Sequence, residues 1–215
     1  MFSPKNLCII FILIFIISCK QNDNNQSQEN ANFVLLKPSE TKIDFINGVK
    51  DQKDFNVLNY RNYYNGGGVA IGDFNNDGLK DIYFTSNLEA NKLYLNKGNM
   101  QFEDITTSAG VGGKGAWSTG VSLVDINHDG FLDIYVCNSG DVAEGSRKNE
   151  LFINNGNLTF TESAAQYGLD DDGFSTHAVF FDYDADGDLD CFVLNNSMTN
   201  PNKIQQNATQ QRMVF

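Results

Sequence analysis

Three acidic segments of nine residues constrain the fold of this chain more than any other feature. They occupy residues 73–81, 125–133 and 182–190, and each fits the pattern D-x-[DN]-x-D-G-x-x-D. Their starting positions place successive copies 52 and then 57 residues apart. An internal repeat of this length is typical of propellers, solenoids or arrays of small units. The chain is therefore expected to fold as a series of similar structural units.

The repeat extends beyond the acidic segments. A short apolar run precedes each segment and another follows it, and residues 91–102 match residues 149–160. These runs are rich in β-branched and aromatic residues and are bounded by Gly, Asn and Asp, which is typical of strands joined by tight turns. Four antiparallel strands per unit describe one propeller blade. We predict an all-β fold, a β-propeller of four-stranded antiparallel blades, over residues 65–215.

The third unit is incomplete in this sequence. It departs from the repeat after Leu194, where a Gln/Asn-rich stretch lacks the Leu-Tyr-Leu pattern of residues 93–95. Residues 65–215 thus supply two complete units and part of a third, whereas a closed propeller ring has at least four blades. We expect the chain to be part of a larger protein.

The acidic segments have the composition of calcium-binding loops. Side chains at positions 1, 3, 5 and 9 and the backbone carbonyl at position 7 can converge on one ion, and glycine at position 6 permits the sharp turn. These ligands are all oxygen atoms, which favours a hard cation, and an irregular loop suits Ca²⁺ better than Mg²⁺. The predicted ligands are Asp73, Asn75, Asp77, Leu79 and Asp81; Asp125, Asn127, Asp129, Phe131 and Asp133; and Asp182, Asp184, Asp186, Asp188 and Asp190.

Two other interpretations of the acidic segments are less consistent with the sequence. An EF-hand loop needs glutamate at position 12 and a helix on each side. Position 12 is Phe84, Val136 or Val193 here, and each lies in a strand-like run. A solvated acidic turn explains a single copy, but three copies in the same register at blade spacing favour a metal site.

From about Asn65 onward, the chain resembles the FG-GAP/VCBS repeat family. The resemblance rests on the run Gly68-Val-Ala-Ile-Gly-Asp73, the Asp-Gly loops and the run Leu93-Tyr-Leu-Asn-Lys-Gly-Asn99 in combination. The family includes repeats similar to the calcium-bearing blades of the integrin α-subunit propeller and to the cartilage acidic protein/ASPIC-UnbV-associated group. This resemblance implies the same propeller fold and calcium as the bound ion.

The first 31 residues are predicted to be a targeting segment and a tether. Residues 1–18 carry one positive charge, at Lys5, followed by an apolar run that is too short for the roughly 20 residues of a membrane span. We interpret them as a signal peptide. Cys19 follows Ile-Ile-Ser and resembles the lipidated cysteine of a bacterial lipobox. An uncleaved anchor or an ordinary secretory signal is the alternative.

The segment after Cys19 is expected to link the lipid to the folded part. Residues 19–31 lack large apolar side chains and cannot bury enough surface to offset the entropy of ordering them. We interpret them as a flexible tether. Residues 32–64 do not show the repeat and are predicted to be a strand-rich lead-in to the first blade.

Composition and the remaining reactive residues argue against several functions. The net charge of −12 excludes a nucleic-acid partner, because phosphates require a basic protein face. His128 and His177 lie in no catalytic motif, so we predict no enzymatic activity. Trp117 is expected to fill a gap between blades or to stack on a ligand. Cys137 and Cys191 are expected to be free, buried thiols on opposite faces of equivalent strands.

These features together predict a lipoprotein of the bacterial outer membrane. Its calcium-bearing blades are expected to act as a binding or adhesion module, with the membrane as one partner through the lipid and an extracellular glycan or protein as the ligand. Whether the protein occupies the periplasmic or the surface-exposed face stays open. The alternative is the N-terminal non-catalytic part of a larger polysaccharide-degrading enzyme.

Overall fold

The computed structural model describes most of the repeat region and little of the N-terminus. It covers residues 33–114, 117–140 and 147–196, together with the backbone of 212–214. The predicted signal peptide, the lipidated Cys19 and the tether therefore lie outside the described residues. No helix within the described ranges is both long and apolar enough to cross a membrane.

The chain divides into two compact units, Met1–Leu36 and Lys37–Phe215. Residues 33–36 are the described part of the first unit, and their side chains are exposed. The second unit contains every helix and strand named below. It begins with the one-turn helix α2 (Pro38–Thr41), and a second short helix, α3 (Thr106–Ala109), follows the first sheet.

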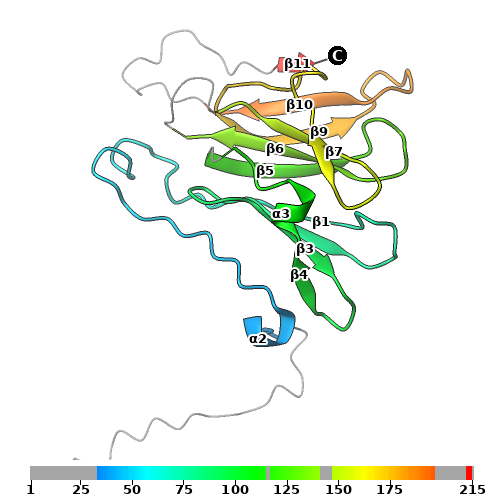
Figure 1. Ribbon diagram of the computed structural model, residues 1–215. Helices are drawn as coiled ribbons and strands as arrows, with labels where there is room; N and C mark the ends of the chain where they lie inside the picture. The colour runs from blue at the N-terminus through cyan, green and yellow to red at the C-terminus, as the bar shows by residue number, and fades with distance from the viewer. Residues whose placement is uncertain (1–32, 115–116, 141–146, 197–211, 215) are drawn as a thin grey trace, which may run out of the picture. The chain divides into compact units, whose positions relative to one another are not determined.

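Three antiparallel sheets, one for each repeat, make up the second unit (Figure 1). Each runs in simple strand order, as a chain of hairpins does. Their strands are β1 (Val69–Gly72), β2 (Asp81–Phe84), β3 (Lys92–Asn96) and β4 (Phe102–Asp104); β5 (Trp117–Val124), β6 (Asp133–Ser139), β7 (Glu150–Asn154) and β8 (Phe160–Glu162); and β9 (Ser175–Phe181), β10 (Asp190–Asn195) and β11 (Arg212–Val214). The predicted all-β fold of four-stranded blades is confirmed.

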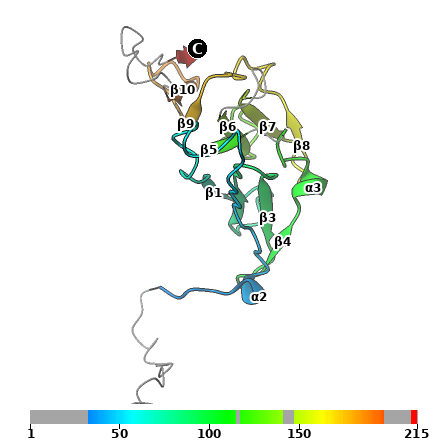
Figure 2. The same ribbon diagram turned by 90° about the vertical axis from the view of Figure 1, so that its left-hand side faces the viewer.

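The sheet β5–β8 lies between the other two (Figures 1 and 2). The first strands of the three sheets, β1, β5 and β9, contact one another in that order. One buried apolar cluster fills the space between the first and second sheets, with Phe74, Tyr83 and Ile134 among its members. A second cluster fills the space between the second and third sheets. The sheets therefore pack face to face around their first strands, as propeller blades do.

The close approach of the first strands depends on glycine. A Cβ atom on Gly120 in β5 would lie 2.4 Å from the backbone oxygen of Thr176 in β9. A Cβ atom on Gly68 would lie 2.8 Å from the backbone oxygen of Thr119. Both distances are shorter than a carbon–oxygen contact allows, so any larger residue forces neighbouring strands apart.

Gly120→Ala is accordingly expected to lower the free energy of unfolding by about 1–3 kcal/mol, as overpacking does in a close-packed core. Gly48→Ala is the matched control, because its Cβ would meet its nearest atom, Glu89 Oε1, only at 3.9 Å. Urea denaturation of both variants in saturating calcium measures the difference. Equal destabilisation by the two substitutions would show that the close spacing of β5 and β9 does not restrict the size of the residue at position 120.

The two cysteines within the described residues lie in the cluster between the second and third sheets. Cys137 of β6 and Cys191 of β10 are both free and buried there. Because their sheets face each other, the two thiols occupy opposite faces of equivalent strands, and this prediction is confirmed. Burial raises the pKa of the Cys191 thiol to about 12 and raises the pKa of the Cys137 thiol as well. Both thiols therefore stay protonated and unreactive at neutral pH.

The lead-in differs from the strand-rich segment that the sequence predicted. Its described residues, 33–64, contain the helix α2 and a series of turns instead of strands. The side chains of Asn56 and Asn59 bond backbone groups of the same segment, for example Asn59 Nδ2 to the Asp54 carbonyl at 2.8 Å. Such local bonds compete with the hydrogen-bonding ladder of a strand.

Trp117 packs against the lead-in and does not fill a gap between blades. Its ring packs with Phe55, Tyr60 and Tyr63, at centroid distances of 5.0, 5.4 and 5.1 Å, and it is only 2% exposed. Trp117 thus fixes the lead-in against the start of β5. Trp117 also lines a small cavity where β1, β5 and β9 begin, so its predicted contact with a ligand stays a prediction.

Candidate metal centre

The three acidic loops join the first strand of each sheet to the second, and they share one hydrogen-bonding pattern. In the first loop, Asp73 Oδ1 accepts a bond from the Asp77 amide at 3.1 Å and Asp73 Oδ2 accepts one from the Gly78 amide at 2.8 Å. The corresponding bonds recur from Asp125 and from Asp182, at 2.9–3.2 Å. The carboxylate at position 1 therefore closes each loop on itself.

The backbone of the loops is the same in all three copies. The glycine at position 6 has a φ of 87° in Gly78, 87° in Gly130 and 99° in Gly187. Residues other than glycine rarely adopt such values, which explains why glycine occupies this position. The residue at position 4 also has a positive φ, near 60°, whether it is Asn76, His128 or Ala185.

The carboxylates at position 9 anchor the first two loops in the protein interior. Asp81 accepts bonds from the amides of Phe74 and Asn96, at 2.9 and 2.8 Å. Asp133 accepts the equivalent bonds from Ile126 and Asn154, at 3.0 and 2.8 Å. Neither aspartate is exposed to solvent.

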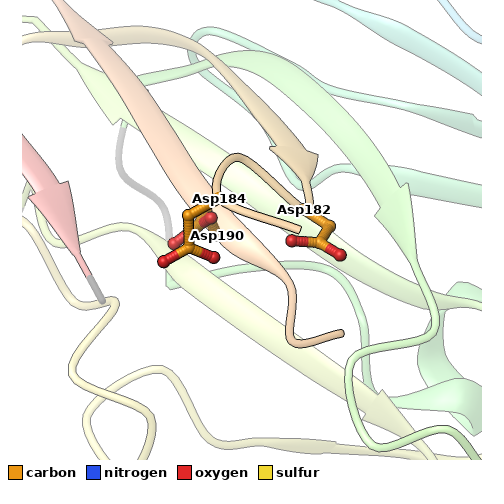
Figure 3. Close-up of side chains that lie close together, drawn as sticks. All are labelled: Asp182, Asp184 and Asp190. Carbon is orange, nitrogen blue, oxygen red and sulfur yellow. The ribbon is translucent and has the colours of Figure 1, made fainter. Parts of the chain in front are cut away.

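The third loop places three acidic side chains closest together. Asp182, Asp184 and Asp190 each present a carboxylate oxygen, and these oxygens lie within 4.8 Å of one another. Figure 3 shows the side chains of Asp184 and Asp190 close together and Asp182 beside them. Asp186, the predicted ligand at position 5, is outside this group, and its Oδ1 accepts a bond from the Asp188 amide at 2.9 Å.

The first two loops use asparagine at position 3. Asn75 Nδ2 donates to Asp77 Oδ2 at 3.0 Å, and Asn127 Nδ2 donates to Asp129 Oδ2 at 2.9 Å. These bonds hold positions 3 and 5 together in each loop. Only the third loop has carboxylates at all four side-chain ligand positions, and Asp188 makes five aspartates in this loop.

The pKa values reflect how these carboxylates are held. Burial raises the pKa of Asp81 and of Asp133, although the backbone amides that bond them act in the opposite direction. The neighbouring acidic side chains of the same loops raise both values further. A bound cation reverses both effects, because opposite charge favours the ionised carboxylate. Hydrogen bonds from the Leu79 amide and Asn75 lower the pKa of the exposed Asp77.

The donor set of the loops fits calcium. The side-chain donors are carboxylate and amide oxygens, and no thiol or imidazole is among the predicted ligands. Ca²⁺ binds six to eight oxygen atoms in irregular geometry, whereas Mg²⁺ requires a near-ideal octahedron. The side chains at positions 1, 3, 5 and 9 and the carbonyls of Leu79, Phe131 and Asp188 are the groups that would hold the ions.

Two residues that hold the site were not singled out from the sequence. Asn96 and Asn154 end β3 and β7, and their amides bond the buried carboxylates of Asp81 and Asp133. Their side chains also cap the loops, since Asn96 Nδ2 donates to the Lys80 carbonyl and Asn154 Nδ2 to the Leu132 carbonyl. The signal was present, because asparagine ends both Leu-Tyr-Leu-Asn and Leu-Phe-Ile-Asn in the matched segments.

Asp186→Ala is expected to lower the melting temperature in calcium more than Asp77→Ala does. Asp186 belongs to the loop with four carboxylates at its side-chain ligand positions, and more charged ligands give tighter calcium binding. A tenfold difference in affinity corresponds to about 3–6 °C for a domain of this size. Calorimetry of both variants in saturating calcium measures it, and equal shifts would contradict the ranking of the loops.

Together, the sheets and loops define a repeat protein of propeller blades, each with an acidic loop after its first strand. A profile of FG-GAP-like repeats matches residues 73–136 and 141–193, more than half of the chain. The chain therefore belongs to the FG-GAP-like repeat family, as its sequence motifs predicted.

Relatives of known identity support this assignment. The chain is similar to cartilage acidic protein 1 of Xenopus tropicalis, with 32% identity over 145 residues, which are 67% of this chain and 22% of the relative. It is also similar to cartilage acidic protein 1 of Mus musculus and of Homo sapiens, with 38% and 36% identity over 72 residues, or 34% of this chain and 11% of each relative. The matched part of the chain thus spans about a fifth of the length of the Xenopus protein and about a tenth of the mouse and human proteins.

Proposed function

We propose that this chain is a calcium-binding, non-catalytic part of a lipid-anchored protein in the bacterial outer membrane. FG-GAP repeats form binding or adhesion modules, and we assign that role to these blades. The observation that carries the proposal is the common arrangement of the three loops, in which the first carboxylate bonds two loop amides. Bound calcium supplies the positive charge that holds such loops together, so the carboxylates serve the structure and not proton transfer.

Membrane attachment in this proposal depends on Cys19. A lipobox cysteine offers the one thiol to which the diacylglycerol group is transferred, so Cys19→Ser is expected to move the protein from the membrane fraction to the soluble fraction. Detergent partitioning of the wild-type and variant proteins measures this. Cys191→Ser is the matched control, because that thiol is buried in the fold. Unchanged partitioning of Cys19→Ser with a cleaved signal would contradict the anchor.

The ligand is proposed to bind at the opposite end of the first strands from the calcium loops. The loops follow the ends of β1, β5 and β9, whereas a cavity of about 180 Å³ lies where these strands begin. Every residue that lines it is uncharged, and Asn62, Asn65, Thr119 and Thr176 supply polar side chains. An uncharged polar lining suits a sugar better than an ionic group, so a glycan is the proposed ligand.

A glycan array tests this function directly. The Cys19→Ser protein is applied in calcium and in chelator, and binding is expected in calcium alone. Asn65→Ala should weaken binding, whereas Gln101→Ala should not, because Gln101 lies on the turn before β4 and outside the cavity lining. Absence of glycan binding in calcium would overturn the assigned ligand and leave a protein ligand to be sought.

A further inference from the structure

Two hydrogen bonds connect the first acidic loop to the second, across the boundary between blades. The first bond runs directly between the loops: Asn76 Nδ2 donates to the Gly130 carbonyl at 3.0 Å. Asn76 occupies position 4 of its loop and Gly130 occupies position 6 of the next. The two loops are therefore in direct contact, through residues that lie between the predicted ligands of each loop.

Asn154 makes the second connection from the end of β7. Its amide donates to Asp133 Oδ1 at 2.8 Å, which holds the last predicted ligand of the second loop. Its side-chain Nδ2 donates to the Phe74 carbonyl of the first loop at 2.9 Å. Asn154 is buried, so these bonds are shielded from competing water. One residue thus contacts both loops.

Phe74 extends this connection to the first loop's own buried ligand. The Phe74 amide donates to Asp81 Oδ2 at 2.9 Å. The Phe74 ring is fully buried between the two sheets and packs against Phe160 at a centroid distance of 6.0 Å. Packing therefore supports the hydrogen bonds of Phe74, whose amide contacts Asp81 and whose carbonyl contacts Asn154. Asp133, Asn154, Phe74 and Asp81 form a continuous chain of contacts.

Among the described residues, the equivalent positions make different contacts. Asn96 is the counterpart of Asn154, and its Nδ2 donates to the Lys80 carbonyl within its own blade. Between the second and third loops, a cavity of about 270 Å³ is lined by His128 and Asp188. Within the part of the chain that the structure describes, no hydrogen bond joins these two loops.

We propose that Asn154 and Asn76 couple the first two calcium loops, so that an ion in one loop tightens binding in the other. This inference rests on the proposed calcium function. An ion that orders the first loop also fixes the Phe74 carbonyl and the Asn76 side chain. The second loop then loses less conformational entropy when it binds its own ion, which is positive cooperativity. Coupling of this kind typically changes affinity by about fivefold or more.

Calcium binding by the third loop is first removed with the triple substitution Asp182→Asn, Asp184→Asn and Asp186→Asn. Calorimetric titration of this variant of the full chain with calcium then tests the coupling. We expect this variant to bind two ions per chain with a Hill coefficient above 1. The coefficient cannot exceed the number of sites. Asn154→Ala and Asn76→Gly should each reduce the coefficient toward 1. The Asn76→Gly variant is expected to fold normally, because Asn76 is an exposed loop residue and glycine adopts its φ of 58° without strain.

Two matched substitutions serve as controls. Asn155→Ala removes the exposed asparagine next to Asn154, whose side chain bonds Thr159 and Thr161, and His128→Gly changes position 4 of the second loop, where φ is also 58°. Both should leave the cooperativity unchanged. Two ions that bind with independent affinities in the parent, or unchanged cooperativity in both Asn154→Ala and Asn76→Gly, would overturn the coupling. Absence of any bound calcium would instead overturn the proposed function, and the coupling with it.

Discussion

Replacement of Asp133 by alanine is expected to lower the free energy of unfolding by about 1–4 kcal/mol, even in chelator. The substitution leaves the buried amide of Asn154 and the partly buried amide of Ile126 without their acceptor. Each buried donor that loses its partner costs about 1–3 kcal/mol. Urea denaturation with chelator measures this loss without any contribution from bound calcium.

Asp129→Ala provides the matched comparison within the same loop. Asp129 is exposed and bonds the loop amide of Phe131, so its loss leaves no buried donor unpaired. Its cost in chelator is therefore expected to stay within about 1 kcal/mol. In calcium both variants should lose a further and similar amount of stability, because each removes a predicted ligand of the second loop. Equal losses in chelator would contradict the structural role of the buried carboxylate.

Saturating calcium is expected to raise the melting temperature by about 15–30 °C over the value in chelator. An ion at a hundredfold excess over its dissociation constant stabilises the folded state by about 2.7 kcal/mol, so three sites contribute about 8 kcal/mol. For a domain of this size, each kcal/mol shifts the melting temperature by about 2–4 °C. Differential scanning calorimetry measures the shift.

The shift should be specific for the ion. Magnesium at the same concentration should produce a much smaller shift, because the irregular loops cannot supply its octahedral geometry. A rise in melting temperature that is the same for both ions would indicate screening of the negative charge instead of binding in the loops. Chelator should reverse the calcium effect, since no covalent change is involved.

The sequence predicted the blades and loops because their signals are local. Each loop is a contiguous run of nine residues whose pattern of aspartate and glycine fixes its backbone. The strands next to it follow from short apolar runs, and β1 and β2 lie within one residue of the predicted segments. Because each pattern recurs along the chain, a segment that is ambiguous in one unit could be interpreted from the equivalent segments of the other units.

The features that the sequence did not predict depend on contacts between distant residues. Trp117 packs against Phe55, and Asn154 bonds the Phe74 carbonyl, a residue 80 positions away. No local pattern specifies such partners. The spacing required at Gly120 likewise depends on a neighbouring strand. The lead-in is an exception, because its turns have a local cause: the side chains of Asn56 and Asn59 bond nearby backbone groups and favour turns over a strand.

Calcium stoichiometry is the most direct test of the central claim, that the acidic loops are metal sites. Equilibrium dialysis of the Cys19→Ser protein against millimolar calcium is expected to give three ions per chain. Asp73→Ala, Asp125→Ala and Asp182→Ala should each reduce that number by one, because each removes the carboxylate that closes its loop. Absence of bound calcium, or a content that none of the three substitutions changes, would contradict the account.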